Sequence, residues 1–271
     1  MFYLSGLLIA FVSIVFSVIH LRQSASNYID PVGIAVVFGG TIAVAVMVLP
    51  WEMHREIREA FRNLFSSKKA DHKVLNFECF EMIRTLQGGS TQFEPKDTTA
   101  AGQILRDGAE LISLGFDPDK VHTILEERIY QWAERKQKIA NSLRSLSKYP
   151  PAFGLVGTVL GLVSLMNAIS AGASSTEAGV RMAVALVATL YGLIVANLIL
   201  NPAGENVLKA ALEEKKGAEL ALQAVLLAAK KVSLLEAQEV LNSFVAPADR
   251  INILGMRLGS ETPGEESEAA A

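Results

Sequence analysis

The stretch "PPAFGLVGTVLGLVSLMNAI", Pro150 to Ile169, decides the fold class of this chain. Its 20 residues include two prolines and three glycines and carry no charge. A helix of that length rises about 1.5 Å per residue and can cross a hydrocarbon core roughly 30 Å thick. The stretch therefore predicts a membrane-spanning helix that carries little side-chain bulk on one side.

Four stretches of the chain have this character. They contain no Asp, Glu, Lys or Arg, and each can cross the membrane as a helix. They are residues 1–21, 31–51, 149–176 and 182–204. The first has no basic region before it and no small-residue cleavage site after it, so we expect a retained span rather than a signal peptide.

The basic residues predict the orientation of these spans. Of the 25 Lys and Arg residues, only Arg22 and Arg181 fall in the short turns that join the first span to the second and the third to the fourth. Cytoplasmic segments carry the excess of Lys and Arg in membrane proteins. We therefore expect both termini in the cytoplasm and two tight hairpins outside.

The sequence thus predicts an all-α integral membrane protein, with four transmembrane helices and a helical cytoplasmic domain. A cytoplasmic helical pattern follows the second span, and another follows the fourth. The predicted parts are a first transmembrane hairpin (1–51), a cytoplasmic helical domain (52–148), a second transmembrane hairpin (149–204), cytoplasmic C-terminal helices (205–258) and a disordered acidic tail (259–271).

Composition argues against several function classes. The net charge of −3 gives no basic face for nucleic acid. The single cysteine, Cys79, excludes a disulfide within the chain and a cysteine metal cluster. The four histidines have no ligand spacing, and no hydrolase triad or phosphate loop is visible. We therefore expect no enzyme, no metal site and no cofactor.

Small residues form a stripe on the third and fourth spans. In the third span the stripe begins with Gly154, Gly157 and Gly161, at intervals of three and four residues that place them on one helix face. In the fourth, Thr189 and Gly192 belong to a similar stripe. Such stripes let helix backbones approach closely. Two interpretations stay open: the two spans pack against each other, or the stripes face a helix of another protein.

Polar atoms are rare on these stripes. The hydroxyls of Thr158 and Thr189 lie on or beside them and are candidates for an ion pathway. The alternative is that each hydroxyl bonds its own helix backbone. No span contains an ionisable Asp, Glu, Lys or Arg, although ion-driven membrane machines use such a group within the bilayer. An ion-driven function would therefore need a partner that supplies it.

Prolines stand where two spans meet the cytoplasm. Pro150 and Pro151 precede the third span, and Pro202 follows the fourth. Each removes a backbone donor and favours a kink. We expect Pro151 and Pro202 to act as paired hinges that couple the membrane to the cytoplasmic part.

Four segments together resemble one family. They are "PAFGLVGTVLGLV", "MAVALVATLYGLIVANLILNP", "DPVGIAVVFGGTIAVAV" and "DGAELISLGFDPDKVHTILEERI". They resemble the flagellar stator subunit MotA and its sodium-type relative PomA, within a wider family that includes ExbB and TolQ. The resemblance covers most of the chain except the tail. Four spans rather than three favour MotA over ExbB and TolQ.

The resemblance implies a stator subunit in the bacterial inner membrane. Such subunits form a homo-pentamer around a dimer of a single-span partner, MotB or PomB, whose membrane aspartate carries the ion. Ion flow then turns a flagellar rotor protein through the cytoplasmic domain, with membrane lipid around the spans. Thr158 and Thr189 match threonines of sodium-type members, so the resemblance favours sodium over protons. The glycines Gly154, Gly157, Gly161 and Gly192 are expected to pack against the partner helix.

The loop expected to face the rotor departs from the family pattern. In "TLQGGSTQFE", Gly89 and Glu94 keep their register, but Leu86 stands where many members have a basic residue. Arg84 is the nearest substitute, so Glu94 and Arg84 are the expected rotor contacts. An ExbB- or TolQ-like subunit that energises envelope transport or division remains an alternative, as does a membrane scaffold without ion flow.

Overall fold

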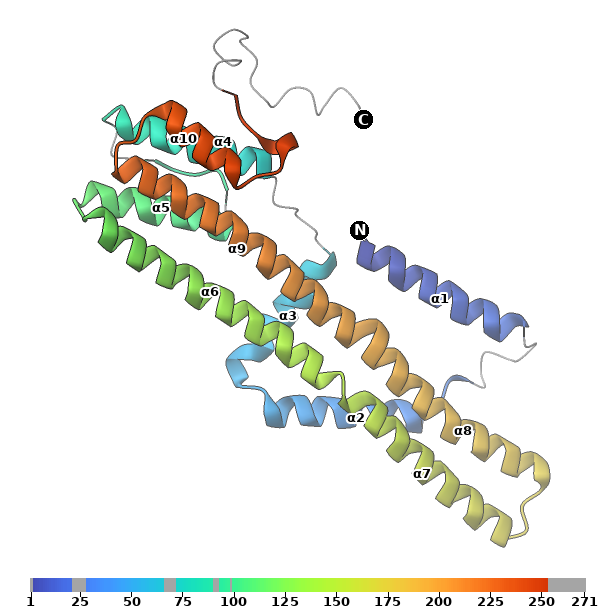
Figure 1. The fold of residues 1–271 in the computed structure, drawn as a ribbon. Coiled ribbons are helices and arrows are strands. Elements are labelled where there is room, and N and C mark those ends of the chain that lie inside the picture. Colours follow the sequence, from blue (N-terminus) through green and yellow to red (C-terminus); the bar gives the residue numbers. More distant parts are fainter. Residues whose placement is uncertain (1, 21–27, 66–71, 90–92, 98, 253–271) are drawn as a thin grey trace. The chain divides into compact units, whose positions relative to one another are not determined.

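The computed structural model describes the chain except residues 1, 21–27, 66–71, 90–92, 98 and 253–271 (Figure 1). Arg22, part of the predicted rotor-facing loop and the predicted acidic tail lie outside the described residues. The described part is helical and contains no strand. Its helices are α1 (Phe2–His20), α2 (Pro31–Val48), α3 (Trp51–Phe65), α4 (His72–Gln87), α5 (Ala100–Ser113), α6 (Pro118–Leu146), α7 (Tyr149–Ser170), α8 (Ser175–Ile194), α9 (Asn201–Ala229) and α10 (Leu234–Ser243).

Within the described residues, three helical runs are long and apolar enough to cross a membrane. They are α2, the run Pro118–Ser170 that contains α7, and the run Ser175–Ala229 that contains α8. The described apolar part of α1, Ser5–His20, is shorter. An all-helical protein with helices long and apolar enough to cross a membrane is therefore confirmed. The predicted first span, at the N-terminus, and with it the total of four spans, stays a prediction.

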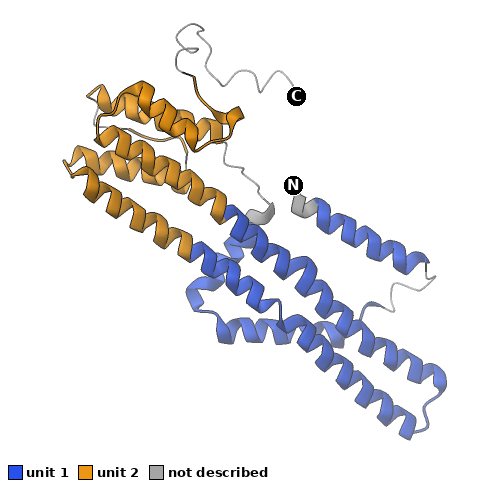
Figure 2. Cartoon of the chain, viewed as in Figure 1, with its two compact units in different colours: residues 1–68, 135–210 blue, residues 69–134, 211–271 orange. Residues whose placement is uncertain are grey.

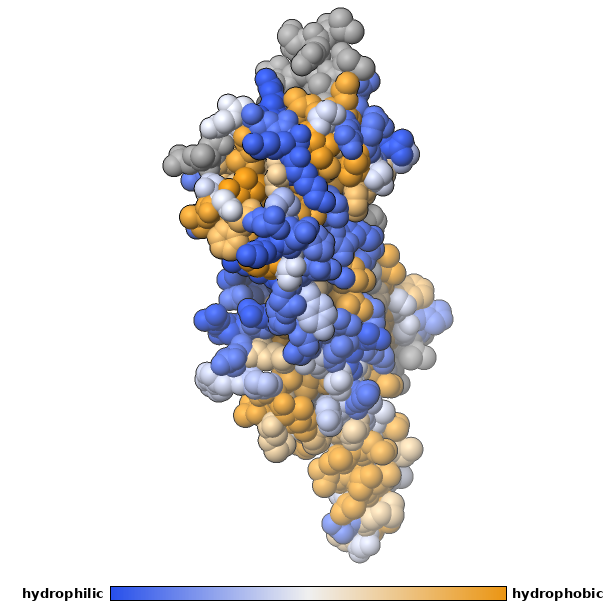
Figure 3. All heavy atoms as spheres, turned by 60° about the vertical axis from the view of Figure 1, so that its left-hand side comes forward, coloured by the Kyte–Doolittle hydropathy of each residue, from blue (hydrophilic) through white to orange (hydrophobic). Residues whose placement is uncertain are grey.

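The chain divides into two compact units (Figure 2). The first comprises Met1–Lys68 and Arg135–Ala210 and holds the apolar spans. Here α7 and α8 pack along each other, and α2 packs against both. The surface of the α7–α8 hairpin is largely hydrophobic, as the orange lower part of Figure 3 shows. An exposed apolar surface of this kind is suited to lipid or to other membrane helices.

The second unit comprises Lys69–Glu134 and Ala211–Ala271, and a core of Leu, Ile, Val and Ala side chains holds it together. Cys79 is fully buried in this core. Burial raises the pKa of the Cys79 thiol far above its ordinary value, and the nearby carboxylates of Glu78 and Asp97 raise it further. The thiol is therefore a packing group and stays protonated at physiological pH.

Glu78 and Asp97 fix the segment that leads into α5. The backbone N–H of Asp97 donates to Glu78 Oε2 at 3.3 Å. The Asp97 carboxylate accepts from the Thr99 N–H at 2.9 Å and from the Thr99 hydroxyl at 2.6 Å. A Cβ on Gly102 would lie 1.9 Å from the Asp97 carbonyl oxygen, so this turn requires a glycine.

Candidate functional site

The two candidate threonines meet between α7 and α8. The hydroxyls of Thr158 and Thr189 are hydrogen-bonded to each other. The Thr158 hydroxyl also lies 3.1 Å from the Gly154 carbonyl oxygen and 3.0 Å from that of Ala185, and the Thr189 hydroxyl lies 3.3 Å from the Gly154 carbonyl oxygen. Four oxygen atoms therefore converge between two apolar helices. Oxygen atoms from hydroxyls and backbone carbonyls can replace the water around a small cation.

The small stripe of α7 lies directly against α8. A Cβ on Gly161 would lie 2.5 Å from the Cβ of Ala185, and a Cβ on Gly157 would lie 2.6 Å from the Cβ of Ala188. One on Gly154 would lie 3.0 Å from the Ala188 carbonyl oxygen. These three glycines therefore pack within the chain, as one of the two open interpretations expected. Their contact with a partner helix stays a prediction.

Gly192 makes the closest approach, at the start of α7. A Cβ there would lie 2.4 Å from the carbonyl oxygen of Pro150 and 3.0 Å from the Cα of Pro151. Both of these are backbone atoms, so no change of rotamer can relieve the contact. Gly192 thus holds the C-terminal part of α8 against the proline segment at the start of α7.

Both predicted proline kinks coincide with an irregularity of the helices. The helical run Pro118–Ser170 is interrupted at Ser147 and Lys148, just before Pro150 and Pro151. On the other side, a π-helical segment, Val195–Leu200, separates α8 from α9, which has Pro202 as its second residue. A π-helical segment is a recognised cause of a kink, as is proline.

Polar side chains join the two irregular segments. The Ser147 hydroxyl is 2.6 Å from Asn201 Oδ1, and the Arg144 guanidinium is 3.1 Å from the Glu205 carboxylate. Ser147 is buried, whereas the ion pair is largely exposed. The sequence places the two prolines far apart, and the structure brings their helix irregularities side by side.

Arg181 is a charged residue whose position the sequence did not predict. It was expected in the external turn, but it lies inside α8. Its guanidinium donates to the Ser164 hydroxyl of α7 at 2.9 Å and pairs with Glu177 at 3.2 Å. Arg181 therefore joins the N-terminal part of α8 to α7 through Ser164, which lies three residues beyond Gly161 on the same helix face.

Asp30 is a second residue that sequence reasoning missed. It is buried, and its carboxylate caps α2 by accepting from the N–H groups of Val32 at 3.1 Å and Gly33 at 2.6 Å. Its own N–H donates to the Tyr191 hydroxyl at 3.0 Å. A Cβ on Gly33, which Asp30 caps, would lie 3.2 Å from the Cβ of Ala188, so the capped start of α2 lies against α8. The sequence signal was an Asp before Pro31, a usual N-cap pattern.

The two predicted rotor contacts do not contact each other. Arg84, near the end of α4, pairs with Glu81 at 3.3 Å and is largely exposed. Glu94 is exposed in the segment before α5. The structure therefore leaves both charges at the surface of the second unit, and their role in binding a rotor remains a prediction.

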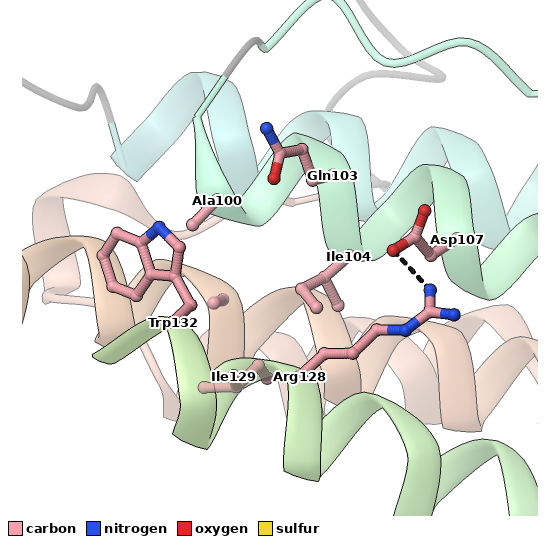
Figure 4. Close-up of a pocket in the computed structure, with 8 residues that line it drawn as sticks. Ala100, Gln103, Ile104, Asp107, Arg128, Ile129 and Trp132 are labelled. Carbon is pink, nitrogen blue, oxygen red and sulfur yellow. Dashed lines mark hydrogen bonds and ion pairs between the residues drawn. The ribbon is translucent and has the colours of Figure 1, made fainter. Parts of the chain in front are cut away.

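A small cavity of about 210 Å³ lies in the second unit (Figure 4). Ile104 and Trp132 contribute to its walls, and the Asp107 carboxylate pairs with Arg128 at its edge with a distance of 2.6 Å. None of its described lining residues is a Ser, Cys or His. Among all described residues, no group of three His, Cys, Asp or Glu side chains could hold a metal ion.

Comparisons with known proteins find one family model and several motility proteins to which the chain is similar. Residues 96–218 match the profile of the MotA/TolQ/ExbB proton channel family. The chain is 31% identical to Motility protein A of Borreliella burgdorferi over 158 residues, which is 58% of this chain and 59% of that protein. It is 22% identical to Motility protein A of Bacillus subtilis over 271 residues, covering 99% of this chain and 98% of that protein.

A solved structure of the flagellar MotAB stator complex from Bacillus subtilis has the same fold. The TM-score is 0.81 at 22% sequence identity, and the superposition covers 92% of this chain and 98% of that chain. This likeness concerns the fold, whereas the profile match includes α7 and α8, where the threonine pair lies. The chain is therefore similar to the MotA/TolQ/ExbB proton channel family, and the matched segment, residues 96–218, is a little under half of the chain.

Proposed function

We propose that the chain is a stator subunit of the bacterial flagellar motor. Together with a single-span partner of the MotB or PomB type, it forms an ion channel that converts ion-motive force into rotor torque. The observation that carries this proposal is the cluster of four oxygens around Thr158 and Thr189, set between the charge-free stretches 149–176 and 182–204 of α7 and α8. The full-length similarity to Motility protein A of Bacillus subtilis supports the same function.

The proposed topology has four spans in the bacterial inner membrane. In it, α1 is the first span, although its described apolar part is shorter than the others. Both termini, α4, α5 and α10 lie in the cytoplasm, which follows from the distribution of Lys and Arg. The chain acts as a channel subunit rather than as an enzyme. It uses no cofactor, and the ion that it transports is sodium or a proton.

The partner supplies the group that carries the ion. The charge-free stretches 31–51, 149–176 and 182–204 contain no carboxylate, and both oxygens of Asp30, just before the second span, already accept hydrogen bonds from the start of α2. An Asp on the partner's single span would fill this need. We expect five copies of the chain around the partner helices, as the family resemblance implies. Exposed apolar side chains of α7, such as Val159 and Met166, would then face lipid or neighbouring helices.

Ion flux tests the proposal directly. Moving one charge through 100 mV releases about 2.3 kcal/mol, but a bare charge at mid-bilayer costs about 2.5–3.5 kcal/mol or more. A carboxylate that is neutralised and re-formed avoids that cost. We therefore expect no steady flux of sodium or protons into proteoliposomes that contain the purified chain alone. Flux should appear when the chain is co-reconstituted with its partner.

Two controls make the flux measurement decisive. A partner variant with Asn in place of its membrane Asp should co-purify with the chain, but the resulting complex should conduct no ions. Comparing sodium-free and sodium-containing buffers identifies the ion, for which the two threonines favour sodium. Steady flux through the chain alone would refute the proposal.

Charge reversal tests the contact with the rotor. Glu94→Lys combined with Arg84→Glu should reduce torque in swimming or tethered cells, because the contact depends on exposed charges. Such pairs are each worth about 0–1 kcal/mol, so single changes should be mild. Stability should stay the same, since both side chains are exposed. Asp119→Lys, on the exposed first turn of α6, is the control for the single change Glu94→Lys, because each reverses one exposed carboxylate to an ammonium.

A double reversal without any effect on torque would remove Glu94 and Arg84 from the rotor interface. It would also favour the alternative function, an ExbB- or TolQ-like subunit that energises envelope transport or division. Leu86, where many flagellar members carry a basic residue, is the observation that keeps this alternative open. Motility of a strain that lacks the chain distinguishes the two functions.

A further inference from the structure

The side chains of α3 separate into three sectors around the helix. Successive residues of a helix are about 100° apart, which fixes the sector of each position. One sector is apolar and includes Ile57, Ala60 and Phe61. The second is basic and carries an aromatic residue: Trp51, Arg55, Arg58 and Arg62. The third is acidic: Glu52, Glu56 and Glu59. The helix has no net charge from Arg and Glu, but its charges of opposite sign lie on different sides.

The apolar sector is occupied by contacts within the first unit. Ile57, Ala60 and Phe61 pack against a small cluster formed by Ile139 and Leu143 of α6 and Ala203 of α9. In Figure 1, α3 crosses behind both of these helices. Its orientation is therefore fixed by packing, and the basic sector points away from the cluster.

The basic sector is open. Trp51 is 84% exposed, which is unusual for so large an apolar side chain in a folded unit. The Arg55 side chain is 77% exposed, and its carboxylate partner Glu59 is 3.9 Å away, at the limit of an ion pair. Arg58 and Arg62 are exposed and form no ion pair with any described residue. Three guanidinium groups and an indole thus share an uncovered face.

This face lies next to the membrane. The 18 residues of α2 span about 27 Å, close to the thickness of the hydrocarbon core. Only Leu49 and Pro50 separate α2 from Trp51, so Trp51 is within about 10 Å of the end of the span. Because α6 and α9 lead away from the inner ends of α7 and α8, a helix that crosses both runs along the membrane surface.

We propose that the basic sector of α3 binds the phosphate groups of anionic phospholipids in the inner leaflet, with Trp51 seated at the boundary between headgroups and acyl chains. Trp is enriched at that boundary because one part of its ring system is apolar and the other polar. Each arginine beside a membrane strengthens the binding of anionic lipid roughly fivefold. The acidic sector lies about a quarter turn around the helix from the basic sector, so its carboxylates point to the side of the phosphates that would repel them. This surface does not depend on which ion the channel carries.

Trp51 itself reports on the proposal. The chain has two tryptophans, so in the full chain carrying Trp132→Phe the fluorescence comes from Trp51 alone. The protein is reconstituted in bilayers that mix phosphatidylglycerol with phosphatidylcholine, and either one or the other lipid is brominated to quench fluorescence. We expect brominated phosphatidylglycerol to quench Trp51 at least twofold more than brominated phosphatidylcholine at equal content.

Matched variants locate the effect on the basic sector. Arg55→Gln, Arg58→Gln and Arg62→Gln together should lower the quenching ratio of the two lipids to about one. Glu52→Gln, Glu56→Gln and Glu59→Gln together remove as many charges from the same helix and should leave the ratio unchanged or raise it. Size-exclusion elution and far-UV circular dichroism establish that both triple variants are folded.

Two results would overturn the proposal. If the two brominated lipids quench Trp51 equally in the protein that keeps all three arginines, Trp51 enters the interface without any selection of headgroups. Absence of quenching by both would mean that protein, such as a neighbouring copy of the chain, covers this face of α3.

Discussion

Gly192→Leu should prevent the chain from assembling its α7–α8 hairpin. The new Cβ would lie 2.4 Å from the Pro150 carbonyl oxygen and 3.0 Å from the Pro151 Cα, so the two helices must move apart. Overpacking of this kind costs about 1–3 kcal/mol and occasionally more. We expect a cost near the upper end, because the obstacles are backbone atoms. The readouts are yield, monodispersity and thermal midpoint of the chain expressed in the absence of its partner.

Gly39→Leu is the matched control for this prediction. Gly39 lies in α2, is exposed and has open space around its Cβ position, so the same substitution should leave the thermal midpoint nearly unchanged. The experiment also separates the two roles of the glycine stripe. Normal behaviour of Gly192→Leu alone, together with failure to co-purify the partner, would contradict packing within the chain. It would show instead that Gly192 faces the partner helix.

The sequence predicted the helices of this fold well because charge and hydropathy mark them along the chain. Stretches without charge, the prolines that flank them and the amphipathic helices between them follow from local patterns. The break near Pro150 and the irregular segment before Pro202 occur where proline predicts them. The π-helical form of Val195–Leu200 left no local signal, because it depends on how the whole helix accommodates its neighbours.

The candidate site was predicted only in part, because the spacing of small residues along a helix does not identify the helix that packs against them. A stripe of small residues shows that something comes close, and the structure identifies α8 as the neighbour of Gly154, Gly157 and Gly161. The pairing of Thr158 with Thr189 likewise depends on the relative height of two antiparallel helices. The bond from Asp30 to Tyr191 joins residues 161 positions apart, which no local pattern reveals.

Thr158→Val and Thr189→Val should each block ion passage while the chain still folds. Valine has nearly the same shape as threonine but lacks the hydroxyl, so each change removes one of the four oxygens that meet between α7 and α8. The loss in stability should be about 1 kcal/mol, the usual net worth of a hydrogen bond. A contact between a hydroxyl and a charged group such as the passing ion is worth about 1.5–3 kcal/mol. Losing that contact should therefore lower the rate of ion flux about tenfold or more.

The measurement is ion flux in proteoliposomes with the partner present, with co-purification as the check on assembly. Thr158→Ser keeps the hydroxyl and should retain flux. Thr41→Val in α2 is the matched control, because the Thr41 hydroxyl bonds only its own helix, at 2.6 Å from the Val37 carbonyl oxygen, among the described contacts. Its removal should leave flux unchanged at a similar cost in stability.

If Thr158→Val and Thr189→Val conduct as well as Thr41→Val, the hydroxyl pair is a helix-packing contact. If the two variants are expressed normally but no assembled complex can be purified, the hydroxyl pair is required for the structure of the complex. Flux that falls at least tenfold in an intact complex would instead place the ion beside these two hydroxyls.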